Sequence, residues 1–573
     1  MNAPADRPRP DRVWLSSYAP DVPADIDEQT GSLSHLIEES VSRYRGHVAL
    51  EFFGATITYA ELGDRIARVA HSLHKLGVRK GDRVALVLPN CPQHVVAFYA
   101  ILRIGAVVVE HNPLYTPREL RHQFEDHGAR VAIVWDKIAP TVLDLPKDLD
   151  VKTVIAVNIT RGMPASKRMA LKLPVPAARA AREKLTASAP RGTIAWEKTL
   201  ATRQIKRSHA RPEVGDLALI QYTSGTTGTP KGVMLSHGNL LANAAQSRAW
   251  VPAIERGTSV VYAVLPLFHA YGLTLSLTFA MSMGARLVLF PTFDPDLVLP
   301  VIKKRPPTFL PAVPPIYERL VKAAAAKKIS LAGIEIAISG AMNLPDSIVE
   351  LWEKETGGYL VEGYGLSECS PVLMANPVGT TRKKGTVGIA FPSTELRVVD
   401  PDDITVDRGV GEEGELLARG PQVFSGYWKK PDETAKVLDS DGWFRTGDIV
   451  TMDEDGFVSI VDRIKELIIT GGFNVSPSEV EDTLRTAEGV SDVAVVGLPH
   501  GRGGEDVVAA VVMEPGASFD EDALRAFARE NLTAYKVPRR VVEVEELPKS
   551  LIGKVLRKQV RDDLAASSHV EDQ

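Results

Sequence analysis

The sequence Tyr-Thr-Ser-Gly-Thr-Thr-Gly-Thr-Pro-Lys-Gly at residues 222–232 concentrates hydroxyl groups and glycines around a single lysine. Glycines let backbone N–H groups approach an anion closely, while the hydroxyls and Lys231 add donors and one positive charge. A flexible linker has a similar composition. The apolar runs at 217–220 and 233–235 favour instead a polar loop between two buried elements, and therefore a phosphate-binding loop. No Gly-x4-Gly-Lys-Ser/Thr spacing surrounds Lys231, so this is not a Walker A loop.

Length and composition indicate a soluble chain with more than one domain. The chain has 573 residues, of which 44% are hydrophobic and 24% are charged. The net charge of −5 gives no general argument for nucleic-acid binding. The only cysteines, Cys91 and Cys369, suggest neither a disulfide framework nor a thiolate metal site, which fits a reducing cytosol. Neither a signal peptide nor a transmembrane helix is expected.

Strands and helices alternate along the first two thirds of the chain. The apolar spacing predicts a helix at 33–44 and another at about 92–105. Short buried strands are predicted at 83–88, 130–134, 153–157, 286–290, 334–338 and 359–361. Such alternation is typical of βαβ units in a largely parallel sheet.

The pattern changes twice in the last third of the chain. From about residue 393 the strands are shorter and separated by turn signals, as at 394–399 and 414–418. After a charged segment near 462–466, strands and helices mix over about 110 residues, which is enough for a small domain. We therefore expect a domain boundary near 462–466.

Residues 161–192 form a basic stretch with interleaved apolar residues. It holds eight lysines and arginines and one acidic residue, Glu183. A basic amphipathic segment can lie on an anionic membrane surface. A solvated surface insertion has the same composition, so both interpretations stay open.

Two short polar motifs combine groups that suit a nucleotide. Tyr364-Gly-Leu-Ser-Glu368 supplies a flat ring, a hydroxyl, and a carboxylate of the kind that Mg²⁺ binds together with phosphates. Thr446-Gly-Asp448 places a carboxylate where it could bind the two hydroxyls of a ribose. Each motif is explained equally by a turn with an acidic cap.

Two further residues are ambiguous when considered alone. His269 follows the apolar run 265–268, where a histidine is either catalytic or a satisfied core residue. Lys554 follows Gly553 near the C-terminus, where a lysine can reach an anion or simply lie on the surface.

The order of these motifs closely resembles the adenylate-forming superfamily of acyl-CoA synthetases and luciferases, and within it bacterial long-chain fatty-acid–CoA ligases. The resemblance covers nearly the whole chain. It also includes Asn-Pro-Leu-Tyr-Thr-Pro-Arg-Glu-Leu from residue 112, Gly-Gly-Phe-Asn-Val from 471, Tyr-Lys-Val-Pro from 535 and Leu-Pro-Lys-Ser from 547. It implies an α/β fold with a large N-terminal domain of βαβ sheets, a β-barrel-like subdomain and a small α+β C-terminal domain. The implied bounds are 1–462, a hinge at 463–466 and a mobile domain at 467–573.

The resemblance assigns roles to individual residues. The ATP phosphates would be bound by the loop residues Thr223, Ser224, Gly225, Thr226, Thr227, Gly228 and Lys231. The rest of the nucleotide site would comprise Tyr364 and Gly365 with Gly340 and Ala341 at adenine, Ser367 at phosphate, and Asp448 and Arg463 at the ribose. Thr223 and Glu368 would hold Mg²⁺. His269 and Lys554 would lie at the reacting carboxylate, with Lys465 as the pivot and Gly471 and Gly472 forming the pantetheine passage.

The resemblance also implies a reaction in two steps. A fatty acid attacks the α-phosphate of ATP to give acyl-AMP and pyrophosphate, and coenzyme A then displaces AMP. One site serves both steps if the C-terminal domain turns and withdraws Lys554. The alternatives are a fatty-acyl-AMP ligase or an aryl-acid adenylating enzyme that loads another acceptor. The resemblance implies that a fatty-acyl-AMP ligase carries an inserted segment that disturbs the coenzyme A step. No such insertion is evident between Glu368 and Arg463, which disfavours this alternative.

The expected partners and surroundings follow from the same resemblance. The acyl chain needs an apolar tunnel, for which the candidates are Phe268, Tyr271, Gly272, Leu273, Leu275, Val313 and Pro314. The resemblance suggests a homodimer, and no nucleic-acid partner is expected. We expect a cytoplasmic protein with peripheral contact at the inner membrane face through 161–192.

Overall fold

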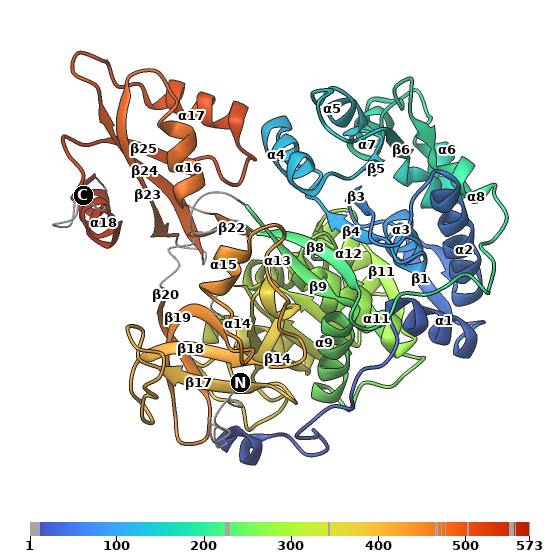
Figure 1. Cartoon of the computed structure of the whole chain (residues 1–573), viewed down its shortest axis with the longest axis horizontal. Coiled ribbons are helices and arrows are strands. Elements are labelled where there is room, and N and C mark those ends of the chain that lie inside the picture. The colour runs from blue at the N-terminus through green and yellow to red at the C-terminus, as the bar shows by residue number, and fades with distance from the viewer. Residues whose placement is uncertain are drawn as a thin grey trace, which may run out of the picture.

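The computed structural model of the chain describes residues 12–223, 230–341, 344–463, 468–470, 473–475, 477–500, 504–548, 555 and 557–571. These residues form two large sheets, a four-stranded sheet and a smaller C-terminal part (Figure 1). The expected α/β fold class is confirmed. The part expected to be barrel-like is an antiparallel sheet of four strands.

The larger sheet has nine strands and is parallel at its centre. Their order is β16-β15-β14-β13-β12-β10-β11-β1-β2. The bounds are β1 Val48–Phe52, β2 Ala55–Thr58, β10 Val260–Ala263, β11 Arg286–Leu289, β12 Phe309–Ala312, β13 Ile336–Ser339, β14 Tyr359–Gly365, β15 Val372–Ala375 and β16 Ile389–Ala390. The strands from β14 to β16 run antiparallel to one another, as do β1 and β2.

The second sheet has seven strands and ends in an antiparallel hairpin. Its order is β7-β6-β5-β3-β4-β8-β9, in which β8 and β9 form the hairpin. The bounds are β3 Arg83–Val87, β4 Val107–Glu110, β5 Val131–Trp135, β6 Thr153–Val157, β7 Ile194–Ala195, β8 Leu217–Thr223 and β9 Lys231–Ser236. Strands β3 to β6 are nearly continuous runs of Val, Ile, Leu and Ala, as expected where a parallel sheet is covered on both faces.

Helices join and cover these two sheets. Helix α3 (Pro92–Arg103) is buried at every residue and contacts β3 and β4 of one sheet and β1 of the other. The remaining N-terminal helices are η1 Val13–Ser17, α1 Leu33–Arg43, α2 Tyr59–Lys75, α4 Pro117–His127, α5 Ala139–Leu143, η2 Ile159–Gly162, α6 Ala165–Ala170, α7 Pro176–Leu185 and α8 Trp196–Leu200. Those of the middle are α9 His237–Trp250, α10 Ala270–Gly272, η3 Leu273–Thr278, α11 Phe279–Met283, α12 Pro295–Ile302, α13 Pro314–Lys327, α14 Asp346–Thr356, η4 Ser367–Cys369 and α15 Pro431–Ala435.

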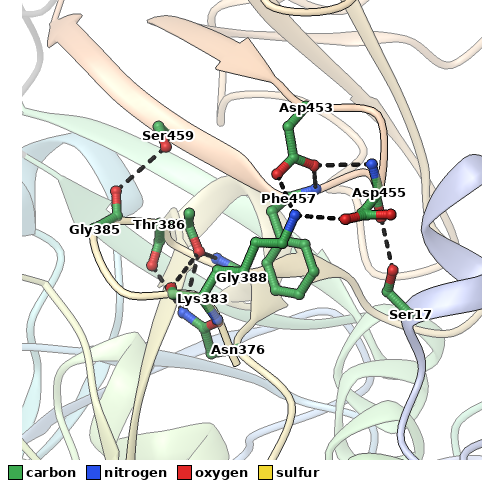
Figure 2. Close-up of polar contacts among 10 residues, drawn as sticks. All are labelled: Ser17, Asn376, Lys383, Gly385, Thr386, Gly388, Asp453, Asp455, Phe457 and Ser459. Carbon is green, nitrogen blue, oxygen red and sulfur yellow. Dashed lines mark hydrogen bonds and ion pairs between the residues drawn. The ribbon is translucent and has the colours of Figure 1, made fainter. Parts of the chain in front are cut away.

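The four-stranded sheet is fixed against the larger sheet by a polar cluster. Its strands are β17 Glu395–Val399, β18 Gly414–Arg419, β19 Phe444–Met452 and β20 Val458–Arg463. Figure 2 shows Lys383 between two carboxylates of the β19–β20 turn, at 2.6 Å from both Asp453 Oδ2 and Asp455 Oδ2. The same ammonium lies 4.7 Å from the ring centre of Phe457. Asn376 accepts from the backbone N–H of Lys383, which ties the cluster to the end of β15.

The C-terminal part has hydrophobic clusters of its own. Its sheets are β21 Ile468–Thr470 with β22 Phe473–Val475, and β23 Val490–Pro499 with β24 Glu505–Met513 and β25 Arg540–Glu543. Its helices are α16 Pro477–Leu484, α17 Glu521–Asn531 and α18 Arg557–Glu571. One cluster packs α16 and α17 against the three-stranded sheet, and a second packs α18 against it. The expected hinge at 463–466 stays a prediction, because 464–467 lie outside the described residues.

Most predicted elements are present with shifted ends. The helix expected at 33–44 is α1, and the strands expected at 83–88, 153–157 and 286–290 are β3, β6 and β11. The strand expected at 334–338 starts two residues later, because the N–H of Ile334 closes a turn onto the carbonyl of Leu331. The basic stretch 161–192 contains two short helices, α6 and α7.

Candidate active site

The predicted phosphate loop joins two strands that pair at its ends. Thr223, the last residue of β8, lies directly opposite Lys231, the first residue of β9. Ser224, Gly225, Thr226, Thr227 and Gly228 lie outside the described residues. Lys231 Nζ is 2.6 Å from Glu433 Oε2 of α15. Hydrogen bonds from Lys231 and Lys436 hold the pKa of Glu433 down at about 2, so this carboxylate stays charged.

Tyr427 lies between Lys231 and Glu368 and was missed by the sequence analysis. Its ring centre is 5.1 Å from Lys231 Nζ, and its hydroxyl donates to Glu368 Oε1 over 2.8 Å. Burial and the carboxylate of Glu368 raise the pKa of Tyr427 well above its usual value, so the phenol remains a donor. Its only sequence signal is an aromatic pair after a glycine, Gly-Tyr-Trp at 426–428, which is weak.

The backbone around Tyr427 connects the loop hairpin to Glu368. The N–H of Trp428 donates to the carbonyl of Gly232 in β9 over 2.7 Å. The N–H of Phe424 donates to the carbonyl of Glu368 over 2.8 Å. The segment 424–428 therefore holds β9 and η4 in one position relative to each other.

A small cavity brings the predicted adenine-site residues together. It has a volume of about 90 Å³, and its lining includes Gly340, Ala341, Tyr364, Gly365, Ser367 and His269. A Cβ on Gly365 would lie 1.9 Å from the carbonyl oxygen of Pro371, so only glycine fits there. A Cβ on Gly340 would lie 3.2 Å from Cζ of Tyr271, which leaves little room for a side chain.

Asp448 is hydrogen-bonded to Tyr364, which lines this cavity. The hydroxyl of Tyr364 donates to Asp448 Oδ2. Asp448 is buried on β19, and its backbone N–H donates to Oγ1 of Thr446 over 3.1 Å. Arg463 is its backbone partner on β20. A flat ring and a carboxylate in contact are suited to recognise the base and the ribose of one nucleoside.

His269 lines the small cavity and also a much larger one. Its Nδ1 accepts from the N–H of Tyr271 over 3.3 Å, so the proton of the neutral ring is on Nε2. Burial lowers its pKa to about 4, and the imidazole is therefore neutral at pH 7. A neutral Nε2–H group can donate to a carboxylate without adding a buried charge.

The larger cavity has a volume of about 1080 Å³ and a mostly apolar lining. Phe268, Tyr271 and Val313 line it as expected, but Gly272, Leu273 and Pro314 line neither cavity, and Leu275 lines the small one. Leu273 and Leu275 are core residues of η3, because that helix packs against α9. Other walls come from residues that the sequence analysis did not assign, including Phe53, Trp135, Phe290, Phe293, Leu297 and Arg319.

One wall of the larger cavity is the basic stretch 161–192. From this segment the lining contains Met163, Lys167, Ala170, Leu171, Ala177, Ala180, Ala181, Lys184 and Leu185. Neither α6 nor α7 buries a side chain. The two helices therefore have one side on the cavity and the other in solvent.

The C-terminal part reaches the larger cavity through Phe473 of β22. Lys465, Gly471, Gly472 and Lys554 lie outside the described residues, and for Arg463 only the backbone is described. Among the described residues after 341, Phe473 is the one that lines this cavity.

Oxygen ligands for Mg²⁺ are present but few. No group of three or more His, Cys, Asp or Glu side chains that could hold a metal occurs among the described residues. Glu368 and Thr223 offer one carboxylate and one hydroxyl. Mg²⁺ commonly binds through one or two protein oxygens and completes its shell with phosphates and water, so this pair fits a metal that arrives with ATP.

Two sequence profiles match the chain. The profile described as AMP-binding enzyme matches residues 37–428, and that described as AMP-binding enzyme C-terminal domain matches 479–554. The chain is 37% identical to a long-chain-fatty-acid–CoA ligase of Bacillus subtilis (strain 168), over 98% of this chain and 99% of that protein. It is 40% identical to a long-chain-fatty-acid–CoA ligase of Salmonella typhimurium, over 96% of this chain and 98% of that protein.

Solved structures show the same fold. The amide bond synthetase McbA from Marinactinospora thermotolerans superimposes with a TM-score of 0.75 at 28% identity, covering 93% of this chain and 99% of that chain. ATP-bound MatB from Rhodopseudomonas palustris has a TM-score of 0.64 at 30% identity, with the same coverage.

Proposed function

Because the chain belongs to the family of AMP-binding enzymes, we propose that it is a long-chain fatty-acid–CoA ligase that forms acyl-AMP from ATP and then acyl-CoA. The position of His269 carries this proposal. This residue lines both the small polar cavity around Tyr364 and the apolar cavity of about 1080 Å³. A fatty acid with its carboxylate at His269 would place its chain in the apolar cavity and its reactive oxygen toward the nucleotide.

In the first step a carboxylate oxygen attacks the α-phosphorus of ATP and pyrophosphate leaves. The Nε2–H of His269 would orient the carboxylate, while Tyr364 and Asp448 would hold the base and the ribose. Lys231, at the end of the loop, would leave Glu433 to meet a phosphate oxygen. Mg²⁺ held by Glu368 and Thr223 would supply positive charge against the phosphates.

In the second step the sulfur of coenzyme A attacks the acyl carbon and AMP leaves. Gly471 and Gly472 would form the passage for the pantetheine arm; they directly precede Phe473 in the sequence, and Phe473 lines the cavity. We assign residues 467–573 to a mobile domain that pivots at Lys465. Its movement would withdraw Lys554, which serves the first step, and bring the passage to the reacting centre for the second step.

The basic wall of the cavity supports a peripheral contact with membranes. Met169, Leu173 and Val175 expose 71%, 55% and 46% of their surface beside the lysines and arginines of 161–192. Apolar side chains flanked by cations suit an anionic lipid surface. No helix within the described residues is long and apolar enough to span a bilayer. We propose that this surface rests on the membrane from which the acid is drawn.

A screen of carboxylic acids tests the proposal. Pyrophosphate release is measured with acids of increasing chain length and with aromatic acids, each with and without coenzyme A. We expect the highest kcat/KM with long alkyl chains and a thioester product that requires coenzyme A. Accumulation of acyl-AMP without thioester would favour an acyl-AMP ligase, and a preference for aromatic acids would favour an aryl-acid enzyme.

A further inference from the structure

A buried lysine joins the C-terminal part to the second sheet. Lys536 Nζ is 2.7 Å from Oε1 of Glu119 in α4 and 2.8 Å from Oε1 of Glu479 in α16. The hydroxyl of Thr533 donates to the same Oε1 of Glu119 over 2.8 Å. The side chains of Lys536 and Glu119 expose only 5% and 8% of their surface. We call the group Glu119, Glu479, Thr533 and Lys536 the α4 contact.

Glu119 uses its two oxygens for two separate tasks. Oε2 accepts from the N–H and the hydroxyl of Thr116 at 2.8 and 2.9 Å, which completes the capping box at the start of α4. Oε1 is turned to Thr533 and Lys536. The helix cap therefore fixes the carboxylate in the orientation that the C-terminal part needs.

The α4 contact continues directly to the larger cavity. The ring of Tyr535, next to Lys536, stacks on the ring of Phe473 with centres 4.2 Å apart and planes 16° apart. Phe473 lines the cavity together with His269 and Leu114. A chain of contacts thus runs from α4 through Lys536 and Tyr535 to Phe473 in the lining of the larger cavity.

The ammonium of Lys536 is buried among carboxylates and would be costly to separate from them. Burial alone would lower the pKa of Lys536, but Glu479, Tyr535, Tyr115 and Glu119 raise it well above its usual value. Removing one partner from a buried ion pair is strongly destabilising because the other charge is left unpaired. Any turn of the C-terminal part away from α4 must break the bonds to Glu119, whereas the bond to Glu479 lies within that part.

We propose that the α4 contact positions the C-terminal part for thioester formation, with Glu119 and Lys536 as positioning residues for the second step. This inference rests on the proposed function. Its reason is geometric: the contact exists in the arrangement in which Phe473, the residue that follows the expected passage Gly471–Gly472 in the sequence, lines the cavity. The contact biases the protein toward this arrangement and is released when the first step is repeated.

Glu119→Gln is the sharpest variant, because glutamine preserves the cap. Its carbonyl can still accept from Thr116, since glutamine also completes a capping box, but its amide would then point donors at Lys536 and Thr533. Lys536→Met removes the other partner. Glu61→Gln is the matched control, because Glu61 completes the same capping box with Thr58 at α2, where its hydrogen bonds are to Thr58.

The two half-reactions are measured separately in these variants. For Glu119→Gln and Lys536→Met we expect thioester formation from supplied acyl-AMP and coenzyme A to slow by at least about tenfold, as for a broken buried pair. Single-turnover pyrophosphate release should stay within about twofold, and the double variant should be no slower than the slower single variant. Glu61→Gln should change neither rate.

Several results would overturn the inference. Equal losses in both half-reactions would mean that the contact only stabilises the fold, and no loss in either would mean that it positions nothing. A wild-type protein that releases pyrophosphate but never forms a thioester would instead refute the proposed function. Amide hydrogen exchange at 533–536 then decides separately whether the contact exists: exchange should rise in Glu119→Gln and not in Glu61→Gln, and unchanged exchange would refute the contact.

Discussion

The hydroxyl of Tyr427 donates a 2.8 Å hydrogen bond to Oε1 of Glu368, the carboxylate proposed to hold Mg²⁺. The ring of Tyr427 contacts the positive group: its centre lies 5.1 Å from the ammonium of Lys231. One side chain thus orients both the anionic and the cationic group that are proposed to meet the phosphates of ATP. The hydroxyl and the ring can be tested separately, because phenylalanine retains only the ring.

Tyr427→Phe should raise the Mg²⁺ concentration needed for half-maximal pyrophosphate release. A hydrogen bond to a charged group contributes about 1.5–3 kcal/mol, so a shift of about tenfold or more is expected. A Mg²⁺ titration at saturating ATP measures it, with Tyr59→Phe as control because that buried hydroxyl donates to the carbonyl of Ala285. Glu368→Ala should have a larger effect. An unchanged Mg²⁺ requirement in Glu368→Ala would remove this residue from the metal site.

Lys554→Ala should abolish acyl-AMP formation while sparing thioester formation from supplied acyl-AMP. The reason is that its positive charge is proposed to serve only the first transition state. Pyrophosphate release and acyl-CoA formation, followed in separate assays, give the two rates. Equal loss of both steps would refute the role assigned to this lysine.

His269→Gln should weaken the acid sensitivity of the fold. The pKa of His269 is about 4 in the folded protein against an ordinary 6.5, so between these values the unfolded chain binds a proton that the folded one does not. Stability is therefore lost as the pH falls from about 6.5 to about 4, by about 3 kcal/mol for this residue.

Denaturant unfolding at pH 7 and pH 4.5 measures this difference in the wild type and in His269→Gln. Glutamine can accept from the N–H of Tyr271 but does not titrate. His111 and His237, whose pKa values burial also lowers, remain as common background in both proteins. The same loss of stability between the two pH values in both proteins would contradict the assignment.

Replacing the lysines and arginines of 161–192 by glutamine should reduce binding to anionic vesicles. Each cation near such a surface contributes about 1 kcal/mol, and the effect should weaken with added salt. Co-sedimentation with vesicles containing phosphatidylglycerol measures it, and vesicles of phosphatidylcholine are the control. Unchanged binding would leave this segment as a solvated insertion.

Ala181→Phe should shift the preference toward shorter acids. Ala181 is on α7 and lines the larger cavity, so a phenyl ring there would fill space that a long acyl chain could occupy. The ratio of kcat/KM for long and medium acids measures the shift. Ala178→Phe is the control, because Ala178 is on the same helix but not in the lining. Equal ratios in the two variants would exclude this wall from the acyl site.

The sequence predicted secondary structure best where aliphatic residues follow one another along a buried element. The strands β3, β5 and β6 could be predicted because both faces of the sheet are covered, so their residues are almost all aliphatic. Tyr427 could not be predicted, since its contacts with Lys231 and Glu368 depend on the pairing of 424–428 with β9. The cavity-lining role of 161–192 could not be predicted, because its alanines and lysines suit an ordinary solvent-exposed surface equally well.

Helices α6 and α7 have no buried side chain of their own, although Ala170, Ala177, Ala180, Ala181 and Leu185 line a cavity. In the proposed function the acyl chain is the partner against which this wall packs, and the ligand completes the core. Each methylene that reaches the wall should then add about 0.8 kcal/mol both to substrate affinity and to the stability of the two helices. The same contact energy between the acyl chain and the wall would therefore determine both the chain-length preference and the local stability of α6 and α7.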